Sequence, residues 1–218
     1  MPVAACATAF LLGACEKISA GTAVRAGGTS LPATTTTPTT QTAVPGVETT
    51  LPEHIPPNAF ACFPQPSGIG TTTVATVSDP AAPRITVAVP DGWTSSPGDG
   101  DVALTLSGPD DMTGKVTIAA TTLDPAAAFS DYAASLRGAH PHAQVDVAAA
   151  QFCGYSSQKL TGTFPGPSGD IAFADRITDI WTNTKTYLVT IHLEGPAGAP
   201  GFDAAKAALM QEFAIVIP

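Results

Sequence analysis

The sequence predicts an α+β domain in which an antiparallel sheet of about six to eight strands is flanked by two helices. Apolar residues alternate in segments separated by Gly, Pro, Asn and Asp, which is typical of strands joined by tight turns. In two places the apolar period lengthens to about 3.6 residues, which indicates a helix. Only 12% of the residues are charged, and 20 Gly and 21 Pro favour a turn-rich sheet protein over a helical bundle.

Three strands are predicted before the first helix. Residues 85–93 (ITVAVPDGW) alternate as far as Pro90, which lacks the amide hydrogen that a strand interior donates. The segments 102–106 and 115–123 alternate in the same way.

The first helix is expected to follow Asp124, because an aspartate carboxylate caps a helix N-terminus and Pro125 suits the first helical position. Gly138 is expected to end this helix. Its apolar face would consist of Phe129, Tyr132, Ala133 and Leu136.

Four more strands, one helix and a closing segment are predicted in the remainder. The expected strands are residues 143–149, 152–164, 171–181 and 186–193. Asp203 is expected to cap the second helix, whose apolar face would consist of Ala205, Leu209, Met210 and Phe213. The last residues, AIVIP, are consistent with a short final strand.

The N-terminal stretch MPVAACATAFLLGAC contains an apolar run that is too short to span a bilayer but has the length of a signal-peptide core. It ends in LGAC, which resembles the bacterial lipobox, where the peptide is cut before a diacylated Cys. We therefore expect residues 1–14 to be a lipoprotein signal peptide and Cys15 to carry the lipid, such as palmitate. No Lys or Arg precedes the run, which indicates a start upstream or a truncated one. The alternative is a buried strand with an unreactive Cys.

A Thr- and Pro-rich stretch, residues 28–58, follows and shows neither a helical nor a strand period. Such a composition buries too little apolar area to offset the entropy of ordering. We expect residues 15–58 to hold the lipidated Cys and a disordered linker, and residues 59–218 to form a single globular domain.

The cysteines predict one disulfide bond. If the signal peptide removes Cys6 and the lipid occupies Cys15, only Cys62 and Cys153 remain. In an exported protein such a pair is expected to be oxidised. A reactive thiol pair is the alternative, but no C-x-x-C spacing supports it.

The run TTTVATVSDPAAPRITVAVPDGW, residues 71–93, resembles the start of the folded domain in the LpqN/LpqT family of mycobacterial lipoproteins. The helix after Asp124 and the closing helix are similar to the pattern of that family. The resemblance covers about residues 60–217. It implies a PsbP-like fold and a cell-envelope protein without known catalysis. It further implies binding of envelope glycolipids or contact with envelope-building proteins.

Motifs for catalysis or cofactor binding are missing from the sequence. GYSSQ lacks the spacing of a nucleophile elbow, and no phosphate-binding loop occurs. His140 and His142 have no third ligand nearby for zinc and are expected in an exposed loop. We therefore expect no metal, no cofactor and no enzymatic activity. A hydrolase with an unrecognised site is a remaining alternative.

Trp93, Phe173 and Trp181 are the candidate ligand-binding residues, because aromatic rings suit both acyl chains and sugar rings. Asp175 and Asp179 fall on the same side of their strand as Phe173 and Trp181. A bulge or an emerging strand end would explain this charge. The alternative is a cavity wall that carries a few polar groups.

The formal charge of −9 excludes a basic surface for nucleic acid. We expect a non-enzymatic, lipid-anchored protein on the outer face of the cytoplasmic membrane. It would bind an amphipathic envelope glycolipid in a groove between sheet and helix. The alternative is a protein-interaction module that docks on envelope biogenesis enzymes or transporters, for which an exposed apolar patch is expected.

Overall fold

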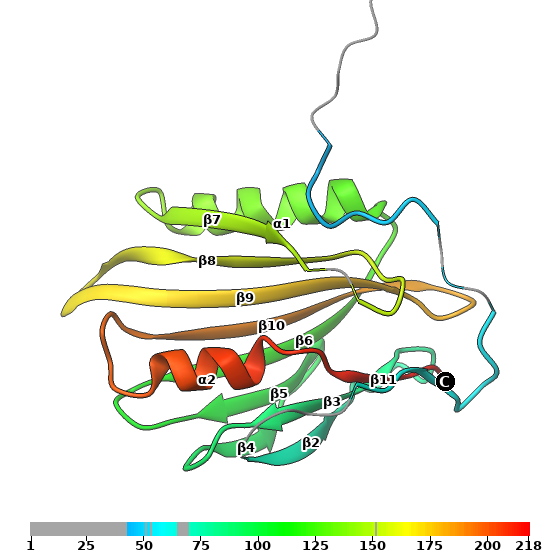
Figure 1. Ribbon diagram of the computed structural model, residues 1–218, viewed down its shortest axis with the longest axis horizontal. Coiled ribbons are helices and arrows are strands. Elements are labelled where there is room, and N and C mark those ends of the chain that lie inside the picture. The colour runs from blue at the N-terminus through cyan, green and yellow to red at the C-terminus, as the bar shows by residue number, and fades with distance from the viewer. Residues whose placement is uncertain (1–42, 51, 53, 65–69, 151) are drawn as a thin grey trace, which may run out of the picture. The chain divides into compact units, whose positions relative to one another are not determined.

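The computed structural model describes residues 43–50, 52, 54–64, 70–150 and 152–218, in which two antiparallel sheets and two helices pack together (Figure 1). The expected signal peptide, Cys15 and the linker up to residue 42 lie outside the described residues. The elements are β1 (Phe60–Cys62), β2 (Thr71–Ala75), β3 (Arg84–Val89), β4 (Thr94–Pro97), β5 (Val102–Ser107), β6 (Thr113–Thr121), α1 (Pro125–Ala139), β7 (Gln144–Ala149), β8 (Ser157–Gly166), β9 (Gly169–Trp181), β10 (Thr186–Pro196), α2 (Phe202–Leu209) and β11 (Ala214–Val216).

The predicted α+β class is confirmed. The larger sheet has seven strands in the order β4-β5-β6-β10-β9-β8-β7, and all of its pairings are antiparallel. A second sheet of four strands has the order β1-β11-β3-β2. The pattern of apolar residues does not predict this second sheet. Nor does it predict β1, β2 and β4, because these strands are short and carry few buried side chains.

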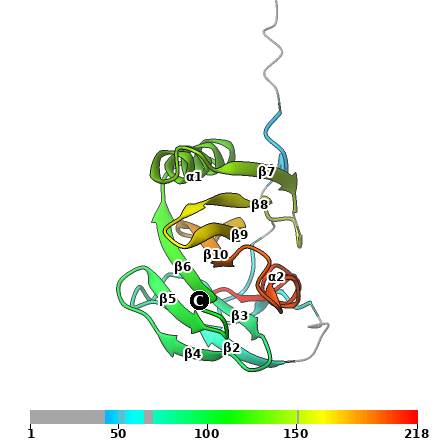
Figure 2. The ribbon, with the colours of Figure 1, turned by 90° about the vertical axis from the view of Figure 1, so that its left-hand side faces the viewer.

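The two faces of the seven-stranded sheet are covered differently (Figure 2). On one face lie α2 and the four-stranded sheet, which bury the main core. Ile85, Val87 and Val89 of β3 point into this core, as their alternation predicts. The other face is covered by α1, and the smaller core there contains Phe129, Leu160 and Phe173.

Helix α1 begins where the sequence predicts and ends later. The Asp124 carboxylate accepts a hydrogen bond from the Ala127 amide at 2.8 Å. At the other end, the helix continues past Gly138 to Ala139, and the His140 amide donates to the carbonyl of Leu136. The expectation that Gly138 ends the helix is therefore wrong. Gly138 adopts no left-handed conformation that would require a glycine.

Helix α2 starts two residues earlier than expected. Its N-cap is Gly201, at φ 86°, and Asp203 lies inside the first turn, where it pairs with Lys206 at 2.7 Å. The predicted capping role of Asp203 is therefore wrong, although a carboxylate in the first turn still favours the helix dipole. The helix ends at Leu209, so Phe213 packs from the segment that follows it.

Residues 43–50, here called the strap, lie along β8 although the composition predicts a disordered linker up to residue 58. The side chain of Gln158 donates to the Pro45 carbonyl at 2.8 Å, and the Ser157 amide donates to the Gly46 carbonyl at 2.9 Å. Val44 and Val47 pack against the core under α1. Gly46 has φ +71°, and a Cβ there would collide with the carbonyl oxygen of Ser157, so only glycine fits.

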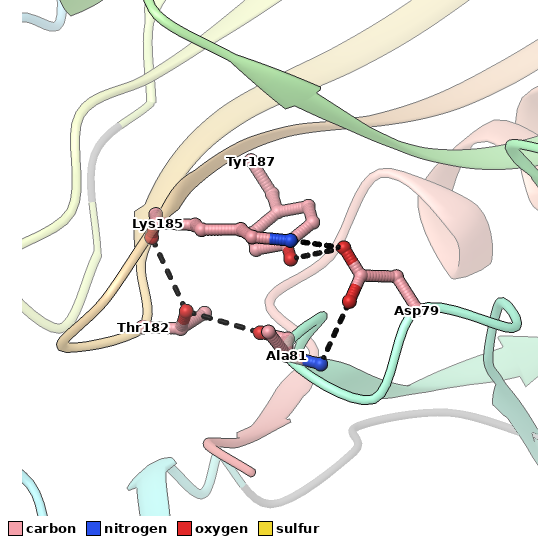
Figure 3. Close-up of polar contacts among 5 residues, drawn as sticks. All are labelled: Asp79, Ala81, Thr182, Lys185 and Tyr187. Carbon is pink, nitrogen blue, oxygen red and sulfur yellow. Dashed lines mark hydrogen bonds and ion pairs between the residues drawn. The ribbon is translucent and has the colours of Figure 1, made fainter.

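A polar cluster joins the β2–β3 loop to the β9–β10 turn (Figure 3). The Asp79 carboxylate accepts hydrogen bonds from Ala81, Lys185 and Tyr187 at 2.9, 2.9 and 2.7 Å. The Thr182 hydroxyl donates to the Ala81 carbonyl at 3.1 Å. The bonds from Lys185, then Ala81 and Tyr187, lower the pKa of Asp79 to about 2. The cluster therefore ties the two sheets together at one end.

The Cys62–Cys153 disulfide is present in the structure. It connects β1 to the turn before β8 across a sequence separation of 91 residues. Cys62 is buried in the main core.

Replacing both cysteines (Cys62→Ser/Cys153→Ser) should lower the free energy of unfolding by about 4 to 5 kcal/mol, because the crosslink removes loop entropy from the unfolded chain. Urea denaturation measures this loss. Dithiothreitol should lower the stability of the unmodified protein by the same amount and leave the variant unchanged. Equal stability of the two proteins would contradict the prediction.

Candidate functional site

A pocket of about 500 Å³ lies against α2 and is here called the α2 pocket. It lies between α2, the loop after β3 and the β5–β6 turn. Its lining is mostly apolar: Pro90, Asp91, Trp93, Pro109, Met112, Gly201, Ala204, Ala205, Ala207 and Ala208.

The α2 pocket is open because the residues of α2 that line it are alanines, and larger side chains at these positions would fill it. Met112 is 1% exposed and reaches the pocket from the β5–β6 turn. Trp93 packs directly on Gly108, where any Cβ would collide with the indole ring. Gly108 therefore sets the position of the one aromatic wall, and Asp91 adds an exposed carboxylate at the rim.

Of the three candidate ligand-binding residues, the structure places Trp93 in the α2 pocket. Phe173 is 1% exposed and packs under α1 with Phe129, on the opposite face of the sheet. Trp181 lies at the end of β9, partly exposed, and does not line this pocket.

The charged residues of β9 are buried in a strand of regular register. Its pairings with β8 and β10 run without a shift, so the expected bulge is wrong. Asp175 is fully buried and its Oδ1 lies 2.5 Å from Nδ1 of His192, the residue opposite on β10. Glu194 lies 3.3 Å from the other ring nitrogen. A buried carboxylate is tolerated here because it has a cationic partner.

His192 is held in its protonated form by these two acids. Burial lowers its pKa, but the hydrogen bonds with Asp175 and Glu194 outweigh burial and raise the pKa to about 9. The bond with His192 also lowers the pKa of Glu194. Burial, then the nearby Asp175, raises the pKa of Tyr132 on α1.

Arg176 points to the opposite face and supports α2. Its guanidinium donates to the carbonyls of Met210 and Ala150 at 2.9 and 2.7 Å and lies 4.3 Å from the centre of the Phe152 ring. Burial lowers the pKa of Arg176 to about 10. The side chain therefore joins the end of α2 to the residues after β7, a role that no local sequence pattern signals.

Asp179 lines a second, smaller pocket of about 260 Å³ beside the strap, here called the strap pocket. The residue is 4% exposed, and its Oδ2 atom has no hydrogen-bond partner among the described residues. Burial, then the nearby Asp124, raises the pKa of Asp179 to about 6. The cavity-wall interpretation of this strand thus fits Asp179, whereas Asp175 belongs to an ion pair.

His140 and His142 lie where the sequence places them, after the first helix. The ring of His140 stacks on Phe164 with a centroid distance of 3.8 Å, and His142 is exposed. The described part of the chain contains no group of three or more His, Cys, Asp or Glu side chains suited to a metal ion.

Stability should depend on pH through His192. Its pKa is raised, so its stabilising contribution is fully present below about pH 6.5 and is lost as pH rises through about 9. The full loss should be on the order of 3 kcal/mol. Urea denaturation between pH 6 and pH 10 measures it. His192→Gln should flatten this decline, whereas the control His142→Gln should retain it. A decline of the same size in His192→Gln would contradict the assignment.

No helix in the described residues has both the length and the apolar character needed to cross a bilayer.

No protein-family model matches the chain, and no curated protein sequence matches it. Solved structures do match. A Pseudomonas aeruginosa protein of unknown function covers 63% of this chain and 92% of its own at 16% identity, but its TM-score of 0.35 supports no inference.

A second solved structure that matches is LpqN of Mycobacterium tuberculosis, which is involved in cell envelope biogenesis. It has a TM-score of 0.54 and 18% sequence identity, and the match covers 67% of this chain and 91% of LpqN. At this identity the likeness concerns architecture. We conclude that the chain has a distant LpqN-like fold.

Proposed function

We propose that this protein is a non-enzymatic, lipid-anchored envelope protein that binds an amphipathic lipid or glycolipid in the α2 pocket. The observation that carries the proposal is the pocket itself, whose volume of about 500 Å³ is in the range of small-molecule sites. Apolar walls with few polar groups favour an aliphatic ligand over a charged one.

The two parts of the pocket suit the two parts of such a ligand. An acyl chain would lie along the alanines of α2 and against Met112 and Trp93, which removes apolar surface from water at about 25 cal/mol per Å². A polar head would remain near Asp91, which is exposed at the rim and can accept hydrogen bonds from sugar hydroxyls.

The anchor belongs to the same proposal. Diacylation of Cys15 would supply the two chains that stable membrane attachment requires. The residues between Cys15 and the strap would span roughly 30 Å as a random coil and up to about 85 Å as polyproline II. The involvement of LpqN in envelope biogenesis supports this location.

A Cys15→Ser variant should lose both incorporation of a labelled fatty acid and retention in the membrane fraction. Unchanged retention would exclude this anchor.

Trp93 and Trp181 are the only tryptophans, so fluorescence can test the pocket directly. In a Trp181→Phe variant the remaining Trp93 should be quenched by a lipid with brominated acyl chains, because quenching requires contact. In the matched Trp93→Phe variant, Trp181 should remain unquenched. Equal quenching in both variants, or none in either, would contradict binding in the α2 pocket.

Filling the pocket should abolish binding without unfolding the protein. Ala208→Leu places a larger side chain on the pocket face of α2, whereas Ala134→Leu places the same side chain on an exposed position of α1. Native mass spectrometry of protein from a mycolic-acid-bearing host should show a lipid adduct on the unmodified chain and on Ala134→Leu. Ala208→Leu should lack it. If none of the three proteins carried a lipid adduct, the proposal of lipid binding would be contradicted.

One observation favours the alternative function, a protein-interaction module. Phe60 and Phe63 are 57% and 61% exposed and lie against each other with ring centroids 4.6 Å apart. Exposed aromatic pairs of this kind are enriched at interfaces. Phe60→Ser/Phe63→Ser should then remove crosslinks to envelope proteins while Val74→Ser, which changes another exposed apolar residue, retains them. Crosslinks unaffected by the double substitution would exclude this surface.

A further inference from the structure

The strap pocket is formed by segments that are distant in the sequence and has polar atoms at its base. It lies between the strap, the start of α1, the turn before β8 and the end of β9. Its lining residues are Glu48, Thr49, Thr50, Pro52, Pro125, Gly154, Tyr155, Ser156 and Asp179. It shares no lining residue with the α2 pocket.

Two buried polar atoms around this pocket lack partners. Oδ2 of Asp179 and the hydroxyl of Tyr155 are both inaccessible to solvent and make no hydrogen bond among the described residues. Asp179 is 4% exposed and Tyr155 is 2% exposed. Leaving such groups unsatisfied costs about 1 to 3 kcal/mol each, and more for a charged group. Asp179 in the pocket lining therefore points to a partner that the described residues do not supply.

The charges around the pocket are all negative. Glu48 contributes a carboxylate from the strap, and Asp124 acts on Asp179 from the start of α1. Among the residues that the structure describes, no Lys or Arg lines the pocket. Asp175 and Arg176 on the same strand already have partners in His192 and in backbone carbonyls, which leaves Asp179 as the buried carboxylate of β9 without one.

We propose that the strap pocket binds a small organic cation whose ammonium or guanidinium group donates hydrogen bonds to Asp179. A buried carboxylate is stabilised most by a cationic hydrogen-bond donor, because the charge-assisted bond offsets the cost of removing the carboxylate from water. The volume of about 260 Å³ limits the ligand to a small molecule. The rings of Pro52 and Pro125 give its body apolar walls.

A metal ion fits this site less well. Calcium requires six to eight oxygen ligands and zinc requires four ligands, whereas the described residues contain no group of three or more metal-binding side chains. An ammonium group needs only one to three acceptors, which Asp179 and the neighbouring hydroxyl of Ser156 can supply.

Binding should depend on pH because the cation pairs with the ionised carboxylate. Among the described residues, the titratable group that acts on Asp179 is Asp124, and the pocket lining adds Glu48 and Tyr155; none of these groups is cationic. With the pKa of Asp179 raised to about 6, a cation should bind about tenfold more weakly at pH 5 than at pH 7.5. Binding should also release a proton near pH 6.

The test uses cyclohexylamine and cyclohexanol, which share a ring and differ in charge. Calorimetry and ligand-observed NMR of the full chain should show that the amine binds at least about tenfold more tightly than the alcohol. Asp179→Asn keeps the shape of the side chain and should weaken the amine by at least about tenfold. The control Asp146→Asn, on exposed strand β7, should leave its affinity unchanged.

Asp179→Asn should also be more stable to urea at pH 7.5 than the unmodified protein, because it removes a desolvated charge, so loss of binding would not reflect unfolding. Three results would overturn the proposal: equal affinity for amine and alcohol, amine binding that survives Asp179→Asn, and no amine binding at either pH. The comparison of amine with alcohol uses the unmodified chain and so holds whatever the variant does.

Discussion

Strand β9 is the element on which both cores depend, because its alternating side chains form the base of each. Phe173 and Ile177 pack under α1, while Ala174 and Ile180 face the core below α2. A strand buried on both faces usually lacks charge. This one also carries buried Asp175, Arg176 and Asp179, so its position requires partners for charges that would otherwise oppose folding.

Those partners connect the strand to the surrounding elements. His192 is the partner of Asp175 from the neighbouring strand, and the carbonyls of Met210, at the end of α2, and Ala150 accept hydrogen bonds from Arg176. The bond to Met210 fixes the C-terminal end of α2, the helix whose alanines line the α2 pocket. Among the described residues Asp179 has no such partner for its Oδ2 atom, and this residue lines the strap pocket.

Much of the fold was predictable, because alternation and helical spacing report which side chains are buried. Asp124 marked the start of α1, and the two cysteines predicted their bond. The strap was not predictable: its Thr- and Pro-rich composition indicates a linker, and its order depends on contacts with Gln158 and Ser157, more than 100 residues away. Pockets likewise arise from packing between distant segments, which is why Trp93 alone of the three aromatic candidates lines the α2 pocket.

The disulfide has a mechanical consequence for a chain held at its N-terminal side. Tension applied there first loads the hydrogen bonds of the strap, which can peel from β8 one at a time. The load then passes to the hydrogen bonds of Ile55 with Asn183 and to the pairing of β1 with β11. At Cys62 the covalent bond transmits it to Cys153 rather than along the chain between them. The segment from β2 to β7, which lies between the two cysteines, is therefore shielded from the tension. The strap can detach from β8 and bind it again while both sheets stay folded.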